Sequence, residues 1–163
     1  MREEHYIKIT EKIRKIKYGE KIFNILDRLL TDAVYIAFMM VVAIMAVQRD
    51  IRVIRIVLVC GVSFAIVSMF RHLYDADRPY TIYNFEPIVK KDKKGHSMPS
   101  RHVFSAFVIA IAFLYVNQIL GIIFLAISVL MAFERVIVGV HFPKDVIAGA
   151  VIGIISGVIG FYL

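Results

Sequence analysis

Several residue types are scarce in this chain of 163 residues, and each scarcity narrows its architecture. Tryptophan is absent, so tyrosine and phenylalanine must supply any aromatic belt at a membrane interface. The one cysteine, Cys60, lies in an apolar run, which excludes an internal disulfide. No polar stretch is long enough to bury a core, so we expect no separate soluble domain. The first 28 residues are charged throughout and lack a continuous apolar segment, which argues against a cleavable signal peptide.

Apolar residues are abundant and gathered in long runs. They make up 60% of the chain, and its mean hydropathy is +0.74. A soluble domain has roughly 45–50% apolar residues, and a helix that crosses a bilayer needs about 20 of them in a row. We therefore expect an all-α membrane protein, a bundle of about five transmembrane helices forming one domain over residues 29–163. The expected spans are 29–47, 53–70, 99–117, 119–138 and 143–163.

Residues 1–28 have a different pattern. Apolar residues recur there every three or four positions among lysines and arginines. This period predicts an amphipathic helix that forms a segment of its own. Its basic residues favour a helix lying in the membrane interface, and the alternative is a solvated helix that packs on a neighbour.

Three polar clusters stand at the ends of the expected spans. Because successive spans alternate in direction, the end of the second, the start of the third, the end of the fourth and the start of the fifth must share one side of the membrane. That side collects all three clusters. They are Arg71 with Arg78 and Pro79; Pro99, Ser100, Arg101 and His102; and Arg135, His141 and Asp145.

These residue types suit the transfer of a phosphate through a histidine. The first N–H groups of a helix and the forks of several arginines bind phosphate oxygens. Asp145 follows His141 by four residues, so its carboxylate can bond to one ring nitrogen and leave the other free to attack. His102 can protonate the leaving alkoxide. Since the rest of the chain is apolar, the expected substrate is a phosphorylated lipid.

The clusters resemble the motifs of the type 2 phosphatidic acid phosphatase superfamily. That family has the patterns K-x6-R-P, P-S-G-H and S-R-x5-H-x3-D, and this chain has R-x6-R-P from Arg71, P-S-R-H from Pro99 and E-R-x5-H-x3-D from Glu134. The resemblance implies that His141 is the nucleophile, forming a phosphohistidine, that Asp145 orients it and that His102 is the general acid. It also implies a metal-independent reaction without a cofactor. The residues it implies for binding phosphate are Arg71, Arg78, Ser100, Arg101 and Arg135.

Three positions depart from the family patterns. Arg71 replaces lysine, which keeps the charge but changes the geometry. Arg101 replaces glycine, and its guanidinium could hold a second phosphate, which favours a diphosphate substrate. Glu134 replaces serine and either pairs with an arginine or faces another helix.

The expected function is a membrane hydrolase of lipid phosphate monoesters or diphosphates. A polyprenyl diphosphate such as undecaprenyl diphosphate is slightly favoured, and phosphatidic acid and phosphatidylglycerol phosphate are also candidates. The alternatives are a catalytically idle protein that binds or transports lipid phosphates, and a phosphotransferase with an acceptor other than water.

The charge distribution bears on partners and location. The net charge of +7 suits bilayer lipids and an anionic substrate better than nucleic acid, so we expect no nucleic-acid partner. All but three of the 20 lysines and arginines would lie on the side of the motifs. The positive-inside rule makes that side cytoplasmic, whereas bacterial members of the resembled family mostly have their site on the outer face. We expect a multi-pass protein of the cell membrane with an extracytoplasmic site.

Two further patterns have alternative interpretations. Gly149, Gly153 and Gly157 recur at every fourth position, which predicts close helix packing or, alternatively, the face of a homo-oligomer. Metal-binding side chains between residues 72 and 96 lack a full ligand set, so we expect no metal site and predict that the aspartates there pair with arginines. The lysine-rich run 90–94 predicts a solvated loop or a contact with lipid head groups.

Overall fold

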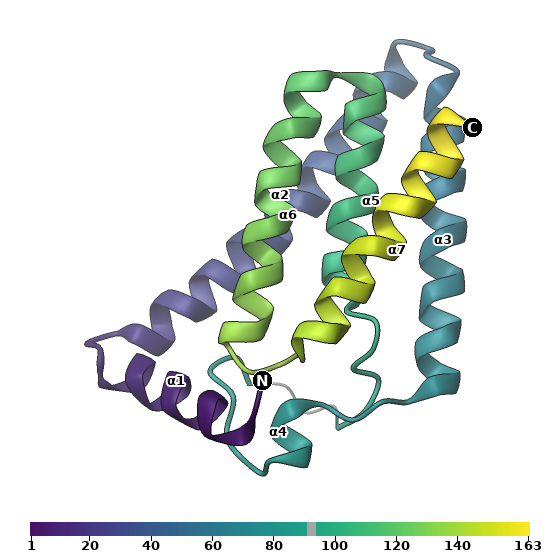
Figure 1. Cartoon of the computed structure of the whole chain (residues 1–163). Coiled ribbons are helices and arrows are strands. Elements are labelled where there is room, and N and C mark those ends of the chain that lie inside the picture. The colour runs from purple at the N-terminus through teal and green to yellow at the C-terminus, as the bar shows by residue number, and fades with distance from the viewer. Residues whose placement is uncertain (91–93) are drawn as a thin grey trace.

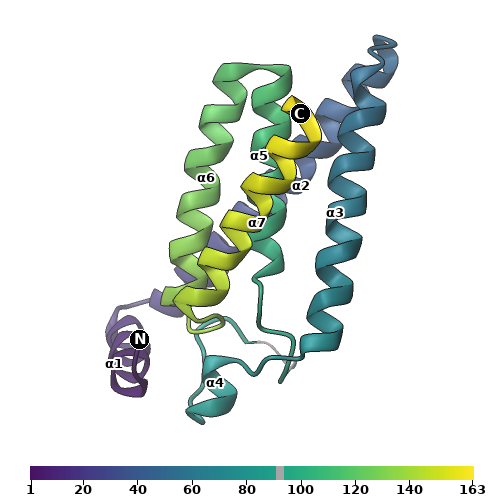
Figure 2. The same cartoon turned by 45° about the vertical axis from the view of Figure 1, so that its right-hand side comes forward.

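The computed structural model describes residues 1–90 and 94–163, and that part of the chain forms helices, turns and irregular segments without a strand. Residues 91–93, within the predicted lysine-rich loop, lie outside the described residues. The helices stand side by side as a bundle, with two short helices across one end (Figures 1 and 2). They are α1 (Glu3–Lys15), α2 (Gly19–Val47), α3 (Arg52–Tyr74), α4 (Pro79–Ile82), α5 (Arg101–Val116), α6 (Gln118–Ile137) and α7 (Pro143–Tyr162).

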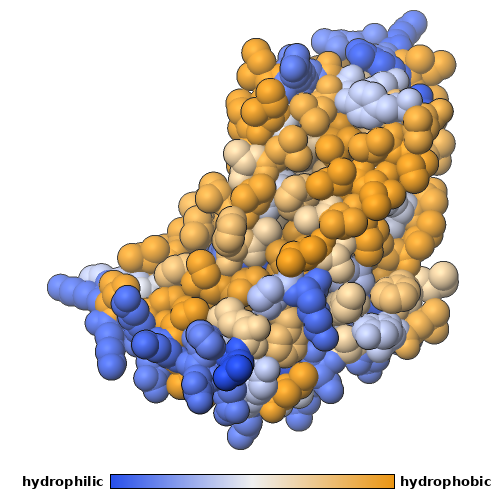
Figure 3. Space-filling view, in the orientation of Figure 1, coloured by the Kyte–Doolittle hydropathy of each residue, from blue (hydrophilic) through white to orange (hydrophobic). Residues whose placement is uncertain are grey.

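In the part of the chain that the structure describes, four helices are long and apolar enough to cross a bilayer, namely α2, α3, α6 and α7. Their exposed side chains are largely apolar, and one face of the molecule shows a broad apolar surface between hydrophilic ends (Figure 3). Soluble monomeric proteins rarely expose so large an apolar surface, and such a surface is typical of a protein in contact with lipid. The prediction of an all-α bundle is therefore confirmed, with four long candidate membrane spans among the described residues where about five were expected.

The predicted third span is shorter than expected. Helix α5 has 16 residues, about 24 Å at 1.5 Å per residue, against a hydrocarbon thickness of about 30 Å. It begins only after the extended backbone of Ser100 and ends at Val116, and the next residue, Asn117, caps α6 by accepting from the N–H of Leu120. Every residue from Val103 to Phe113 is buried. Helix α5 is thus the central helix, and its neighbours shield it from lipid.

Glycines on α7 allow this helix to pack closely on α5. A Cβ atom at Gly149 would lie 2.6 Å from the carbonyl oxygen of Ser100, and one at Gly153 would lie 2.7 Å from that of Phe104. The row of glycines therefore serves close helix packing, as predicted. Helix α5 covers the glycine face that the alternative assigned to a homo-oligomer. The same approach lets the Ser100 N–H donate to the Asp145 carbonyl at 2.8 Å, which joins the starts of α5 and α7.

The N-terminal segment divides where the sequence predicted one continuous amphipathic helix. Helix α1 ends at Lys15, Tyr18 turns the chain with a φ of 66°, and residues 19–28 form the beginning of α2. The apolar side of α1 packs on a cluster that includes Ile88 and Val140.

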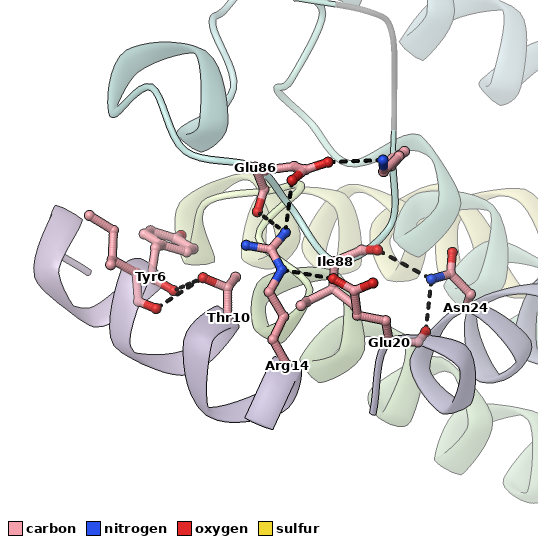
Figure 4. Close-up of polar contacts among 9 residues, drawn as sticks. Tyr6, Thr10, Arg14, Glu20, Asn24, Glu86 and Ile88 are labelled. Carbon is pink, nitrogen blue, oxygen red and sulfur yellow. Dashed lines mark hydrogen bonds and ion pairs between the residues drawn. The ribbon is translucent and has the colours of Figure 1, made fainter. Parts of the chain in front are cut away.

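Polar contacts also fasten α1 to the segment after α4. Figure 4 shows Arg14 bonded to Glu20 at 2.7 Å and to the Glu86 carbonyl at 3.0 Å. Asn24 of α2 reaches the Ile88 carbonyl at 3.2 Å. Helix α1 therefore lies across the end of the bundle at which the polar clusters gather (Figure 1).

Candidate active site

One cavity of about 570 Å³ at this end of the bundle brings together most of the predicted site residues. Six of the eight line it, and the ten lining side chains that belong to the described residues 1–90 and 94–163 are basic, imidazole or hydroxyl groups, with no carboxylate among them. Ser100 and Asp145 are the two that do not line it, and both are fully buried. The lining residues are Ser68, Arg71, His72, Arg78, Lys90, His96, Arg101, His102, Arg135 and His141.

His141 and Asp145 form the predicted pair at the start of α7. Pro143 opens this helix, and Asp145 in its first turn accepts from the Phe142 N–H at 3.0 Å through Oδ2. The same oxygen lies 3.6 Å from Nδ1 of His141. The helix start therefore holds the carboxylate on the Nδ1 side of the ring, and Nε2 is the nitrogen left for chemistry.

Burial keeps the His141 ring uncharged. Its side chain is 3% exposed, and desolvation, helped by the positive charges of Arg78 and Arg71, lowers its pKa to about 4 against the opposing pull of Asp145. At neutral pH the imidazole is neutral and has a lone pair, as a nucleophile requires.

Ser97 is a polar neighbour of this pair that the sequence did not reveal. Its hydroxyl donates to Asp145 Oδ2 at 2.6 Å and lies 3.3 Å from His141 Nδ1. A serine two residues before a proline has no periodicity or spacing that distinguishes it from a loop residue. Only the fold, which closes the segment before α5 onto the start of α7, places it here.

Two of the predicted phosphate ligands also hold the loop that precedes α5. The Arg71 guanidinium donates to the carbonyl oxygens of His96, Ser97 and Pro99. Nε of Arg78 donates to the Gly95 carbonyl at 3.1 Å, and burial lowers the pKa of this arginine. Both side chains line the cavity as well. They therefore hold the loop that forms part of its wall and also give that wall positive charge.

Arg135 is buried at the cavity wall and is held by side chains of α2. Its Nη1 lies 2.6 Å from Asp27 Oδ1, and its Nη2 donates to the Thr31 hydroxyl at 3.0 Å. Glu134, one of the departures from the family pattern, lies 3.5 Å from its Nε. Glu134 thus pairs with an arginine, as one of its two predicted roles required. The two α2 partners were not predicted, because nothing in an apolar span marks which polar residue faces inward.

Arg101 and His102 are the first two residues of α5, and both line the cavity. The Arg101 guanidinium lies over the ring of Phe64 on α3, 5.4 Å from its centroid, a stacking arrangement that arginine favours. The glycine position of the family pattern is therefore filled by a cation that lies toward α3.

Asp75, one of the two aspartates predicted to pair with arginines in the segment after α3, bonds to histidine instead. Asp75 Oδ1 lies 3.0 Å from Nδ1 of His96, whose ring is 5.4 Å from that of His72. Within residues 1–90 and 94–163 no three metal-binding side chains come together.

Tyr6 joins α1 to the loop that carries His141. It is fully buried, and its hydroxyl donates to the His141 carbonyl at 3.1 Å. Its ring packs on those of Phe85 and Phe142, and burial, with the nearby Asp145 charge, raises its pKa. The amphipathic helix is therefore in contact with the site, which its sequence alone did not predict.

The sequence of the chain matches one protein family and several known proteins. Residues 52–163 match the PAP2 superfamily. The chain is 34% identical to the YbjG protein of Escherichia coli K12 over 113 residues, which are 67% of this chain and 54% of that protein. It is 33% identical to the undecaprenyl-diphosphatase of Sulfolobus acidocaldarius over 119 residues, 69% of this chain and 56% of that protein. The chain thus spans about half the length of the curated relatives it matches.

Solved structures show the same arrangement of helices. LpxE of Aquifex aeolicus superimposes with a TM-score of 0.69 and 24% identity, covering 88% of this chain and 93% of that one. A PAP2-type phosphatidylglycerolphosphate phosphatase of Bacillus subtilis gives a TM-score of 0.70 and 20% identity, covering 94% and 81%. At these identities the likeness establishes the fold.

Proposed function

The chain belongs to the PAP2 superfamily, and from this premise we propose that it is a membrane enzyme that hydrolyses lipid phosphates through a phosphohistidine on His141. The observation that carries the proposal is the single cavity that His141, His102 and four arginines line. Binding an anion needs the arginines, whereas two imidazoles, one of them beside a buried carboxylate, are suited to moving protons and a phosphoryl group.

The proposed reaction has two displacements. Nε2 of His141 attacks phosphorus, the bond from phosphorus to the leaving oxygen breaks, and His102 gives that oxygen a proton. A water molecule then attacks the phosphohistidine, His102 takes a proton from it, and the P–N bond breaks to release phosphate. Arg71, Arg78 and Arg135, with the start of α5 beyond Ser100, stabilise the charge on the equatorial oxygens.

Activity on purified protein tests this proposal. We expect wild-type protein in detergent to release phosphate from lipid phosphates in the presence of EDTA, and His141→Ala and His102→Ala each to lower kcat at least about a thousandfold. His5→Ala, a histidine exposed on α1, is the matched control and should retain activity. Turnover by the His141 variant would exclude the covalent route, and an inactive wild-type protein with every lipid tried would favour the idle binding protein.

The substrate class within this proposal is a lipid diphosphate, with a polyprenyl diphosphate in first place. Arg101 supports it, because this cation lines the cavity next to His102, and the leaving group of a diphosphate, which carries the second phosphate, is expected next to the general acid. The Sulfolobus relative has undecaprenyl-diphosphatase as its name. Phosphatidic acid and phosphatidylglycerol phosphate, whose leaving groups are alcohols, are the competing substrates.

Arg101→Gly, which restores the residue of the family pattern, separates these substrates. We expect it to lower kcat/KM for farnesyl diphosphate at least about tenfold more than for phosphatidic acid, because a charged hydrogen bond contributes roughly 1.5–3 kcal/mol. Lys144→Gly removes an exposed cation from the first turn of α7 and should affect both substrates equally. Equal losses for the two substrates in the Arg101 variant would contradict the diphosphate preference.

The proposal also includes five crossings and an extracytoplasmic site. Helix α5 then crosses together with the four longer helices. Several cations on the site side line the cavity or pair with carboxylates, so their number is a poor guide to topology. In a Cys60→Ala background we expect a membrane-impermeant thiol reagent to label Lys94→Cys in intact cells and not Gln48→Cys, both being exposed positions. The reverse labelling would place the site in the cytoplasm.

A further inference from the structure

The Ser97 hydroxyl lies between the proposed nucleophile and its carboxylate. It is 2.6 Å from Asp145 Oδ2 and 3.3 Å from His141 Nδ1, whereas the direct distance between that carboxylate oxygen and the ring nitrogen is 3.6 Å. The direct contact is longer than an ordinary hydrogen bond. We infer that Ser97 is a positioning residue for the reaction, and that its hydroxyl carries the influence of Asp145 to the His141 ring. This inference rests on the proposed function.

The donors and acceptors fix the direction of each bond. An ionised carboxylate has no proton to give, so the serine O–H donates to Asp145. The serine oxygen is then left with lone pairs only, and His141 can bond to it only if Nδ1 carries the hydrogen. A neutral imidazole has one N–H, so Nε2 has the lone pair. The serine therefore selects the tautomer that can attack phosphorus.

The same chain of bonds supports the charge that develops during the reaction. As Nε2 forms its bond to phosphorus, the leaving oxygen departs with the electron pair of the broken bond and the ring becomes positive. The Nδ1–H then donates more strongly to the serine oxygen, which polarises the serine O–H toward Asp145. When water cleaves the P–N bond, the ring returns to neutral. The proton on Nδ1 stays in place throughout.

The surroundings hold the hydroxyl in position and keep water from replacing it. Ser97 and Asp145 are both 0% exposed. The Ser97 N–H donates to the Ala76 carbonyl at 2.8 Å, and its carbonyl accepts from Arg71. Backbone bonds on both sides thus fix the residue, so that the side chain is pre-organised for the ring.

Ser97→Ala tests the inference against a matched control. We expect kcat to fall about 10–100-fold, as on loss of other positioning partners, while KM changes less than about threefold. Accumulation of acid-labile phosphohistidine after rapid quenching should slow by the same factor as kcat. Ser105→Ala removes a buried hydroxyl from α5, outside the cavity, and should keep both rates. Ser97→Thr retains the hydroxyl and should recover part of the loss.

The rates are expressed per folded molecule, measured by circular dichroism in the same detergent. If Ser97→Ala then matches Ser105→Ala in kcat and in phosphohistidine formation, the serine is merely structural and the inference is wrong. A loss that Ser97→Thr does not relieve at all also overturns it. Failure of the proposed function itself is distinguishable, because the wild-type protein would then form no phosphohistidine.

Discussion

At the scale of single residues, the chemistry of the site depends on keeping His141 neutral among cations. Arg78 and Arg71 oppose a second positive charge, and burial opposes any charge, so the pKa of His141 falls to about 4. Asp145 acts in the other direction, and in the proposed reaction it stabilises the ring once it carries a phosphoryl group. Under that proposal its carboxylate stabilises the transition state more than the resting enzyme, as differential binding requires.

A titration of His141 checks this balance. In ¹⁵N-histidine-labelled protein, the signals that disappear in His141→Ala should not shift between pH 8 and pH 5, because the ring protonates only near the lowered pKa of about 4. A midpoint above pH 6 would contradict the structure.

The lowered pKa of His141 also makes the stability of the fold depend on pH. The pKa of His141 is lower in the folded protein than in the unfolded one, so the unfolded chain binds the proton first as the pH falls. The contribution of His141 to stability is fully present above about pH 6.5, the unfolded value. It is lost progressively as the pH falls from there to about 4.

The sequence predicted the contact between His141 and Asp145, because four residues across a helix start leave little freedom. It did not predict Ser97 or Tyr6, whose roles arise from contacts 44 and 135 residues away in sequence. Such contacts follow from packing, and no local pattern encodes them.

At the scale of elements, the short helix α5 determines where the site forms. It is surrounded by its neighbours, and the glycines of α7 let that helix approach the first turn of α5. Because Ser100 and Asp145 are joined through their backbones, any separation of the two helices would also disturb the start of α7, on which His141 depends.

Gly153→Ala should loosen this contact. The new Cβ would lie 2.7 Å from the Phe104 carbonyl, and overpacking of this kind destabilises by about 1–3 kcal/mol. We expect a lower thermal midpoint and reduced kcat. Gly61→Ala in α3, where nothing lies within 4 Å of the new atom, should leave both unchanged or raise the midpoint. Equal effects of the two substitutions would show that α5 and α7 are not closely packed.

The apolar runs predicted the positions of the long helices well, since length and hydropathy define them. They did not predict that the amphipathic segment 1–28 would be divided into two helices by the turn at Tyr18. They did predict the end of α5 to within one residue, since the expected span 99–117 ends next to Val116. The difference is at its start, where Pro99 and Ser100 stay outside the helix.

At the scale of the whole molecule, the site draws on nearly every helix. Asp27 and Thr31 of α2 hold Arg135, and Tyr6 of α1 supports the loop of His141. These three residues precede residue 52, where the match to the family begins. The segment before the family region is therefore part of the working unit, although the family motifs all lie beyond it.

Among the described residues, the cavity wall carries arginines, a lysine and histidines and no carboxylate, and this has a consequence for the steady state. A wall that attracts the phosphate of a substrate also attracts the inorganic phosphate that remains after hydrolysis, and a small dianion has no lipid tail to draw it away. We expect orthophosphate to inhibit competitively and to raise the thermal midpoint, with sodium chloride at equal ionic strength as the control. Equal effects of the two salts would contradict this. The turnover rate would then depend on how quickly orthophosphate is removed from the surroundings of the enzyme.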